Sequence, residues 1–214
     1  MSASLAAVVI FVKAYTLARV QNSNLSWNFA ELKNPTEVDT VNANLALPGM
    51  SFLIDQMQRP DWDEVREIYL QGIAGGQATF ETEAPSWERW DSSHLAMARL
   101  VAREDGRLIG WAALSPVSLR RAYAGVAETS VYVTQDRRAA GVGRQLLAAL
   151  ISESERNQIS TLQAVMFPEN EASVALHRAC GFREVGRRER IGKLDGQWRD
   201  SILFERRSRQ VGVD

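Results

Sequence analysis

The pattern of apolar and polar residues predicts a series of short strands after Met50. Each strand is read from a short run that is continuously apolar or alternates between apolar and polar residues. The runs lie at residues 51–56, 98–104, 108–114, 128–133, 161–167, 185–193 and 198–205. Asp105-Gly106 and Asp195-Gly196 predict hairpin turns, because Asp-Gly pairs readily adopt the backbone angles of a tight turn between antiparallel strands.

Helices are predicted where apolar residues recur at about every third or fourth position. The predicted helices lie at residues 60–72, from residue 86 onward, at 141–157 and at 171–180. The longest of them carries one apolar stripe, formed by Val142, Leu146, Leu147, Leu150 and Ile151. Strands interspersed with helices and hairpins predict a mixed α/β (α+β) fold, with one domain over residues 50–214.

Composition narrows the class of protein. The chain has 214 residues, 45% hydrophobic and 24% charged, with a formal net charge of −1, so we expect one substantial core and no general attraction to nucleic acid or an anionic membrane. One cysteine and two histidines exclude an intramolecular disulfide and argue against a His/Cys zinc site. No apolar stretch approaches the roughly 18 residues of a membrane span. We therefore expect a metal-free, cytoplasmic protein that acts on small molecules, without a nucleic-acid or membrane partner.

Residues 1–49 differ from the rest of the chain. Arg19 is their one arginine, against 21 later, and they carry no recognised motif. The apolar run at residues 5–12 lacks the basic residues before it and the small-residue cleavage site after it that a secretory signal has. Three interpretations stay open: a poorly ordered extension, a short element packed on the main domain, or sequence upstream of a natural start at Met50.

A glycine-bearing loop between a strand and the longest helix predicts an anion site. Gly141 and Gly143 have no Cβ to keep a ligand from the backbone, and N–H groups at the positive end of the helix dipole suit phosphate oxygens. Arg137, Arg138 and Arg144 add positive charge around the loop. A Walker loop would end in Gly-Lys-Ser/Thr, and a dinucleotide fingerprint would require glycine where Leu146 stands, so neither motif is present.

Two motifs resemble the GCN5-related N-acetyltransferase superfamily. Residues 138–143, Arg-Ala-Ala-Gly-Val-Gly, match its Arg/Gln-x-x-Gly-x-Gly/Ala motif, although a glycine turn capping a helix would explain the hexapeptide alone. Residues 170–182 match its second cofactor segment, Asn-x-x-x-x-x-Leu-[Tyr/His]-x-x-x-Gly-Phe. Further similarity at residues 128–133, at His177 and at 185–200 resembles the phosphinothricin (methionine sulfoximine) acetyltransferase branch.

The resemblance implies a fold and a cosubstrate. The fold is a central twisted mixed sheet flanked by helices, and the cosubstrate is acetyl-CoA, with no metal. It also implies a homodimer. The residues it assigns to acetyl-CoA are Val131, Tyr132, Val133, Arg138, Ala139, Ala140, Gly141, Val142, Gly143, Arg144, Asn170 and Ser173. Asn170 would also serve as an N-cap, and the two roles are compatible.

The implied reaction is attack of a neutral amine on the acetyl thioester. Glu128 matches the glutamate assigned as general base in this branch, and an exposed strand carboxylate or salt-bridge partner is the alternative. His177 stands where many members have a tyrosine that protonates the leaving thiolate. It would deliver that proton or orient the amine, or it is a histidine satisfied by packing, and both interpretations stay open.

The implied acceptor is a small amino-acid-like amine: phosphinothricin, methionine sulfoximine or methionine sulfone. Arg120 and Arg121 would hold its carboxylate, although Ser118 stands where the family often has another arginine. Phe80 and Glu81 resemble the acceptor-side loop of the branch. The matching hairpin residues Lys193 and Trp198 have a structural alternative. Other amines (an amino acid, a polyamine or a protein N-terminus) and a non-catalytic CoA-binding module are the alternatives to this function.

Overall fold

The structure is a computed structural model, and it describes residues 52–213. The expectations for residues 1–49 lie outside the described residues. In the described part, the chain forms one sheet of seven strands in the order β1-β2-β3-β4-β5-β7-β6, with helices on both faces. The predicted mixed α/β fold class is therefore confirmed.

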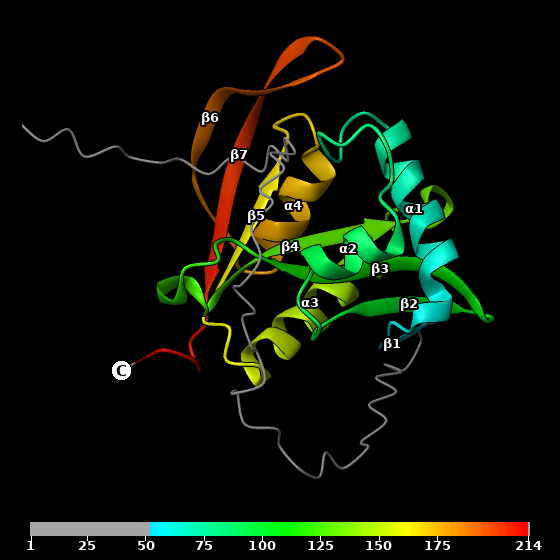
Figure 1. Ribbon diagram of the computed structural model, residues 1–214, viewed down its shortest axis with the longest axis horizontal. Helices are drawn as coiled ribbons and strands as arrows, with labels where there is room; N and C mark the ends of the chain where they lie inside the picture. The colour runs from blue at the N-terminus through cyan, green and yellow to red at the C-terminus, as the bar shows by residue number, and fades with distance from the viewer. Residues whose placement is uncertain (1–51, 214) are drawn as a thin grey trace, which may run out of the picture. The chain divides into compact units, whose positions relative to one another are not determined.

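Every pair of neighbouring strands is antiparallel except β4 and β5, which are parallel. The strands are β1 (Leu53–Gln56), β2 (Leu100–Glu104), β3 (Arg107–Pro116), β4 (Val126–Val133), β5 (Thr161–Met166), β6 (Arg183–Leu194) and β7 (Gln197–Arg207). The long β6–β7 hairpin projects beyond the body of the sheet (Figure 1). The parallel pair needs a crossover, which α3 supplies.

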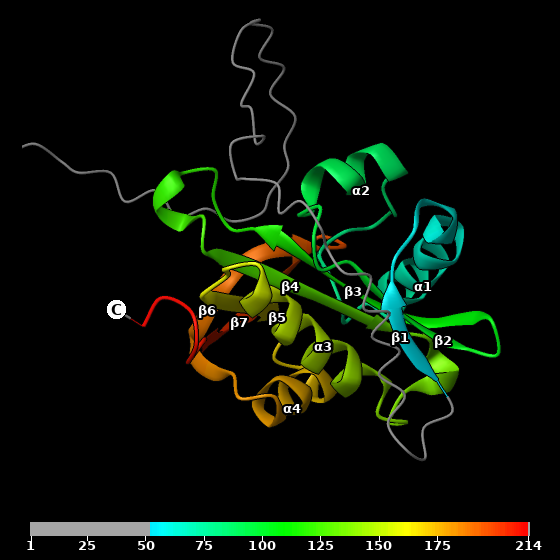
Figure 2. The same ribbon diagram turned by 90° about the horizontal axis from the view of Figure 1, so that it is seen from below.

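The helices lie in two layers, with α1 and α2 on one face of the sheet and α3 and α4 on the other (Figure 2). They are α1 (Trp62–Ala74), α2 (Trp87–Ser93), α3 (Val142–Arg156) and α4 (Glu171–Ala179). Single 3-10 turns lie at Arg59–Asp61, Arg121–Tyr123 and Gln135–Arg137. The helix that we expected from residue 86 begins there because the Ser86 hydroxyl accepts a hydrogen bond from the Arg89 backbone N–H.

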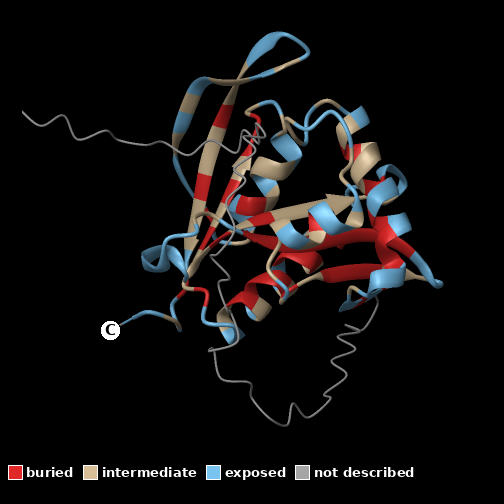
Figure 3. Ribbon diagram, viewed as in Figure 1, coloured by how far each residue is buried: buried red, intermediate tan, exposed pale blue. Residues whose placement is uncertain are grey.

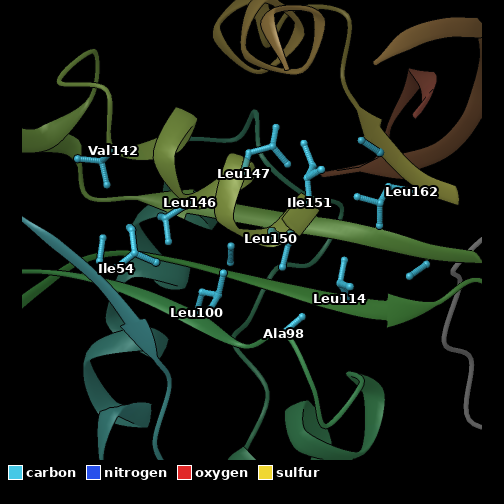
Figure 4. Close-up of a cluster of buried hydrophobic side chains, with 14 of the residues drawn as sticks. Ile54, Ala98, Leu100, Leu114, Val142, Leu146, Leu147, Leu150, Ile151 and Leu162 are labelled. Atoms are coloured by element: carbon cyan, nitrogen blue, oxygen red, sulfur yellow. The ribbon is translucent and has the colours of Figure 1, made fainter. Parts of the chain in front are cut away.

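The main core lies between α3 and the sheet. The predicted apolar stripe of α3 points onto β2 and β3 (Figure 4), and Leu146, Leu147 and Leu150 are fully buried there. Each such leucine contributes about 1.5–3 kcal/mol to stability by leaving water. Figure 3 shows the same distribution, with burial concentrated in the central strands and on the inner side of α3.

A second, aromatic cluster lies on the other face, beneath α1 and α2. The indole of Trp111 stacks on Tyr132 with ring centroids 4.7 Å apart, and Tyr69 meets Tyr132 edge-on at 4.9 Å. Gly72 of α1 makes this packing possible, because a Cβ there would lie 2.8 Å from the Tyr132 ring. The side chain of Tyr132, a residue that the resemblance assigns to acetyl-CoA, is part of this packing.

Both predicted hairpin turns are confirmed. Asp105 and Gly106 have φ values of 50° and 82°, and Asp195 and Gly196 have 49° and 77°. Two consecutive positive φ angles are those of the tight turn that Asp-Gly pairs favour, because their twist matches the twist of the flanking strands.

Candidate active site

The sheet opens between β4 and β5. These strands pair only from Val126–Glu128 to Thr161–Gln163, and then β4 continues beside β3 while β5 continues beside β7. Within the described part of the chain, residues 129–133 therefore present one strand edge that no neighbouring strand pairs. An extended chain with amide groups can hydrogen-bond to such an edge in the manner of an added strand.

The loop before α3 is shaped for an anion. Gly141 is the N-cap residue with φ 85°, it offers no side-chain acceptor, and a Cβ placed on it would meet nothing within 4 Å. The first N–H groups of the helix therefore face open space at the positive end of the helix dipole. Ala139 also has a positive φ, of 62°, in the turn that leads into it. These features fit the pyrophosphate of acetyl-CoA.

The loop and the opening are joined through Gly143. A Cβ on Gly143 would lie 3.4 Å from Leu176 of α4 and 3.6 Å from Val133 of β4. The start of α3, the end of β4 and α4 thus meet at one point. Val131 and Val133, which we expected along the cofactor, pack their side chains against the main core on this side of β4.

The arginines at the loop are used differently from one another. Arg138 and Arg144 are exposed beside it. Arg137, expected as a third source of positive charge, is committed to Glu104, with a distance of 2.6 Å between its Nε and the carboxylate. That hydrogen bond and the Glu104 charge raise the pKa of Arg137. Among the described residues, Arg137 therefore anchors the turn that precedes the glycine loop.

Asn170 and Ser173 organise the start of α4. The Asn170 Oδ1 accepts a hydrogen bond from the Ser173 backbone N–H at 3.1 Å, so the predicted N-cap role is confirmed. Its Nδ2 donates to the carbonyl of Gln77 at 3.0 Å, which ties the α1–α2 connection to α4. Both ends of the Asn170 amide therefore have protein partners, and its contact with a cofactor stays a prediction.

His177 is buried on α4. Its Nδ1 lies 2.8 Å from the Ser173 carbonyl, which only accepts, so Nδ1 carries the proton and Nε2 is the acceptor. The Nε2 atom is buried, with no hydrogen-bond partner among residues 52–213. Burial lowers the pKa of His177, and the neutral ring packs edge-on against Phe182 at 5.0 Å.

Glu128 lies at the inner end of the opening. It is the last β4 residue paired with β5, and it lies opposite Ser115 on β3 and Gln163 on β5. Because side chains alternate along a strand, Glu128 shares its face of the sheet with Tyr132, on the side of α1 and α2. The side chain is half-buried. A carboxylate thus stands where the free edge of β4 begins.

A hollow that is open to solvent lies on the same side of the sheet. Its lining comes from three separate segments: Ala78, Thr79, Phe80, Val165, Met166, Phe167 and Ser201. Phe80 meets Phe167 edge-on at 4.7 Å. Gly192 of β6 leaves room for Phe80, because a Cβ there would lie 2.9 Å from its ring. Phe80, which we expected on the acceptor side, therefore forms a wall of this hollow.

Two residues that we did not predict hold the hollow together. The Arg199 guanidinium lies 4.4 Å from the Phe167 ring and donates to the Gln77 side chain and to Glu169, each at 3.2 Å. Gln77 and Arg199 are 122 residues apart in sequence. No local pattern marks such a pair, so sequence reasoning had no signal for it.

The other expected acceptor residues lie apart from the lining of this hollow. Arg120 and Arg121 are exposed at the β3–β4 connection, where the Ser118 hydroxyl accepts from the Arg120 backbone N–H at 3.2 Å. Glu81 is exposed next to Phe80. Lys193 lies over Trp198 at 4.9 Å near the tip of the β6–β7 hairpin. Their contacts with an acceptor stay predictions.

Two further observations concern the described residues alone. No helix within residues 52–213 is long and apolar enough to cross a membrane. In the same range, no three His, Cys, Asp or Glu side chains come together as a metal ion would require.

Comparisons with known proteins agree with this geometry. The model of the acetyltransferase (GNAT) family matches residues 60–182. A phosphinothricin N-acetyltransferase of Alcaligenes faecalis is 34% identical over 152 residues, which are 68% of this chain and 77% of that protein. An L-methionine sulfoximine/L-methionine sulfone acetyltransferase of Pseudomonas aeruginosa is 35% identical over 134 residues, 62% of this chain and 73% of that protein.

A solved structure gives the same result for the fold. The phosphinothricin acetyltransferase of Sinorhizobium meliloti, in complex with acetyl-CoA, has a TM-score of 0.70 at 27% identity, covering 77% of this chain and 92% of that one. The chain belongs to the acetyltransferase (GNAT) family. It is an acetyl-CoA-dependent N-acetyltransferase, and its similarity is to the phosphinothricin and methionine sulfoximine branch.

Proposed function

We propose that this enzyme acetylates the α-amine of a small amino-acid-like acceptor: phosphinothricin, methionine sulfoximine or methionine sulfone. The observation that carries the proposal is the position of Glu128 at the inner end of the β4–β5 opening, on the side of the hollow. The names of the relatives from Alcaligenes and Pseudomonas supply the acceptor class.

The cosubstrate would lie along the opening. The backbone of Val131–Val133 would pair with the amides of its pantetheine arm, and a β4 N–H would polarise the thioester carbonyl. The backbone N–H groups of residues 139–144, with the Arg138 and Arg144 side chains, would hold the pyrophosphate. The open space beside Gly141 supports this arrangement.

Glu128 would act as the general base. An α-amine is mostly protonated at neutral pH, so the Glu128 carboxylate would take one proton, directly or through water, before nitrogen attacks the carbonyl carbon. The C–N bond then forms, the C–S bond breaks, and the thiolate leaves with the electron pair. The amide nitrogen loses its second proton as the thiolate gains one.

His177 would support this site without donating the proton. Its own proton is on Nδ1 and is held by the Ser173 carbonyl, while the Nε2 atom can only accept. Burial lowers the pKa of the ring, so the protonated form that could donate from Nε2 is disfavoured. We therefore favour the packing interpretation of His177 over the role of an acid.

A thiol-release assay across a panel of amines tests the acceptor class. We expect methionine sulfone, methionine sulfoximine and phosphinothricin to have kcat/KM values at least about tenfold above those of spermidine and of a peptide with a free N-terminus. Higher kcat/KM on a polyamine or on the peptide would overturn the proposed acceptor, while leaving the family unchanged.

A further inference from the structure

Arg188 of β6 is a charged residue on the acceptor side that neither the motifs nor the proposed function uses. Its Nε donates to the Ser201 hydroxyl at 3.0 Å, and Ser201 is fully buried and lines the hollow. A guanidinium has five N–H donors, and this bond uses one of them. The bond fixes the orientation of the Arg188 head group at the wall of the hollow.

The register of the sheet places Arg188 and Glu128 on the same face. Residues directly opposite one another on neighbouring strands point to the same side, which links Glu128 to Gln163 and Gln163 to Glu205. Along β7 every second residue keeps that side, so Ser201 shares it with Glu205, and Arg188 lies opposite Ser201. Both charges thus face the layer of α1 and α2.

Burial and charge set Arg188 apart from the arginines of the surface. The side chain is half-buried, and loss of water lowers the pKa of the guanidinium. The negative charge of Glu128 acts in the opposite direction and raises this pKa. An arginine held in such surroundings interacts more strongly with a bound carboxylate than an exposed arginine does, because water screens the pair less.

The strand bends directly after Arg188. The pairing with β7 shifts between Arg188 and Gly192, and Arg190 in this bulge has a positive φ of 48°. Asp200 holds the bulge, since its carboxylate accepts from the Arg190 backbone N–H at 2.8 Å. The bend brings Gly192 against Phe80, the wall of the hollow. Bulges of this kind re-aim side chains beside binding sites.

We propose that Arg188 binds the α-carboxylate of the acceptor while Glu128 faces its α-amine. This inference rests on the proposed function, since it assumes an α-amino acid as acceptor. The two side chains lie on one face, on strands separated by β5 and β7. The α-amine and α-carboxylate of the acceptor, which share one carbon, would each face the side chain of opposite charge. Arg120 and Arg121, which are exposed at the β3–β4 connection, are the alternative partners of that carboxylate.

The test compares methionine sulfone with its α-carboxamide on purified Arg188→Met and wild-type enzyme. A charge-assisted pair contributes to binding before and during reaction, so we expect Arg188→Met to raise the KM for the acid about 10- to 100-fold, with kcat within about twofold. The KM for the carboxamide should change less than about threefold. The α-amine of the carboxamide is less basic than that of the acid. Because this difference is the same for every variant, it cancels when the ratio of the two KM values (the acid-to-amide ratio) is compared between variants.

Three further variants sharpen the result. Arg188→Lys keeps the charge but loses the planar fork, so its effect on the acid should be intermediate. Arg187→Met is the matched control, because Arg187 is the neighbouring residue on β6, faces the other side and pairs with Asp200 at 2.6 Å. It should leave both KM values unchanged. Arg120→Met tests the carboxylate partner that the sequence predicts, and it should leave the acid-to-amide ratio unchanged.

The outcomes separate the two proposals. The role of Arg188 would be overturned if Arg188→Met raised the KM for the acid and for the carboxamide equally. It would also be overturned if Arg120→Met, and not Arg188→Met, removed the preference for the acid. A changed pH profile of kcat in Arg188→Met, with unchanged KM values, would overturn it as well. If wild-type enzyme acetylates no amino acid in the panel, the proposed function fails and this inference fails with it. The KM for acetyl-CoA and the thermal unfolding curve report whether each variant is folded. If Arg188→Met does not fold, the acid-to-amide ratio of Arg188→Lys decides the outcome.

Discussion

The two sides of the β4–β5 opening are built in different ways. The proposed cofactor side is mostly continuous in sequence, since the free edge of β4 and the loop before α3 both lie within residues 129–144. The proposed acceptor side combines the α1–α2 connection, the end of β5 and the β6–β7 hairpin. The first side presents mainly backbone groups, and the second presents side chains.

This difference shows how one fold can keep its cosubstrate while its acceptor varies. Backbone N–H groups and glycines recognise phosphate and amide groups that are the same in every reaction. Side chains from three separate segments meet at the hollow, away from the loop. We therefore expect substitutions on the two sides to affect the two substrates separately.

The largest effect should come from Glu128, where the two sides meet. Replacing Glu128 by Gln removes the proposed base and should lower kcat by about 10²- to 10⁴-fold, with the KM for acetyl-CoA within about twofold of wild type. Steady-state thiol release measures both values. Glu83→Gln, at an exposed carboxylate of the α1–α2 connection, is the matched control. Unchanged turnover in the Glu128 variant would remove it from the mechanism.

A smaller effect, confined to the cofactor side, should follow Gly141→Val. A valine at φ 85° is strained and would place its side chain in the open space before the helix, so we expect the KM for acetyl-CoA to rise about tenfold or more, with the acceptor KM unchanged. Gly106→Val provides the control, because Gly106 has a similar φ of 82° with nothing within 4 Å but lies in the β2–β3 turn. Similar KM changes in both variants would attribute the effect to general strain.

On the acceptor side, Gly192→Ala should give a change of about three- to tenfold. The new Cβ would lie 2.9 Å from the Phe80 ring and displace it, which should raise the KM for methionine sulfone and spare that for acetyl-CoA. Gly186→Ala lies on the same strand with nothing within 4 Å of its Cβ, and should change neither value. An equal rise for both substrates would contradict the independence of the two sides.

The smallest effect concerns stability and pH. Burial lowers the folded-state pKa of His177, so below its unfolded value of about 6.5 the unfolded chain binds a proton that the folded chain does not. Its contribution to stability is therefore complete above about pH 6.5 and falls as pH drops towards the folded pKa, with a slope of at most about 1.4 kcal/mol per pH unit. His177→Asn keeps a donor for Ser173 and should lose this slope in urea unfolding at pH 5–7.5. If the free energy of unfolding had the same slope with pH in the wild type and in His177→Asn, His177 would not be the source of the pH dependence.

The elements of the fold were predictable because their signals are local. The apolar stripe of α3, the two Asp-Gly turns and the Ser86 and Asn170 caps each depend on residues a few positions apart. The glycine loop was predictable for the same reason. These features follow from backbone angles and from periodicity, which one sequence displays directly.

The acceptor side was less predictable because it depends on register. Arg188 reaches Ser201, a residue of the hollow, only because the two lie opposite one another on β6 and β7, and the bulge before Gly192 leaves no pattern in the sequence. From the sequence alone, Arg137 is expected to add positive charge to the anion site. In the fold it is hydrogen-bonded to Glu104. The opening between β4 and β5 likewise depends on where their pairing ends.

The opening also bears on self-association. An unpaired strand edge at the rim of a sheet invites other chains to add to it, and proteins usually protect such rims. Here the free backbone of residues 129–133 lies in the middle of the sheet, with β3 on one side and β5, which pairs with β7, on the other. The helices α1 and α3 lie in the layers above and below it. A ligand can thus use main-chain groups without the protein exposing an aggregation-prone border.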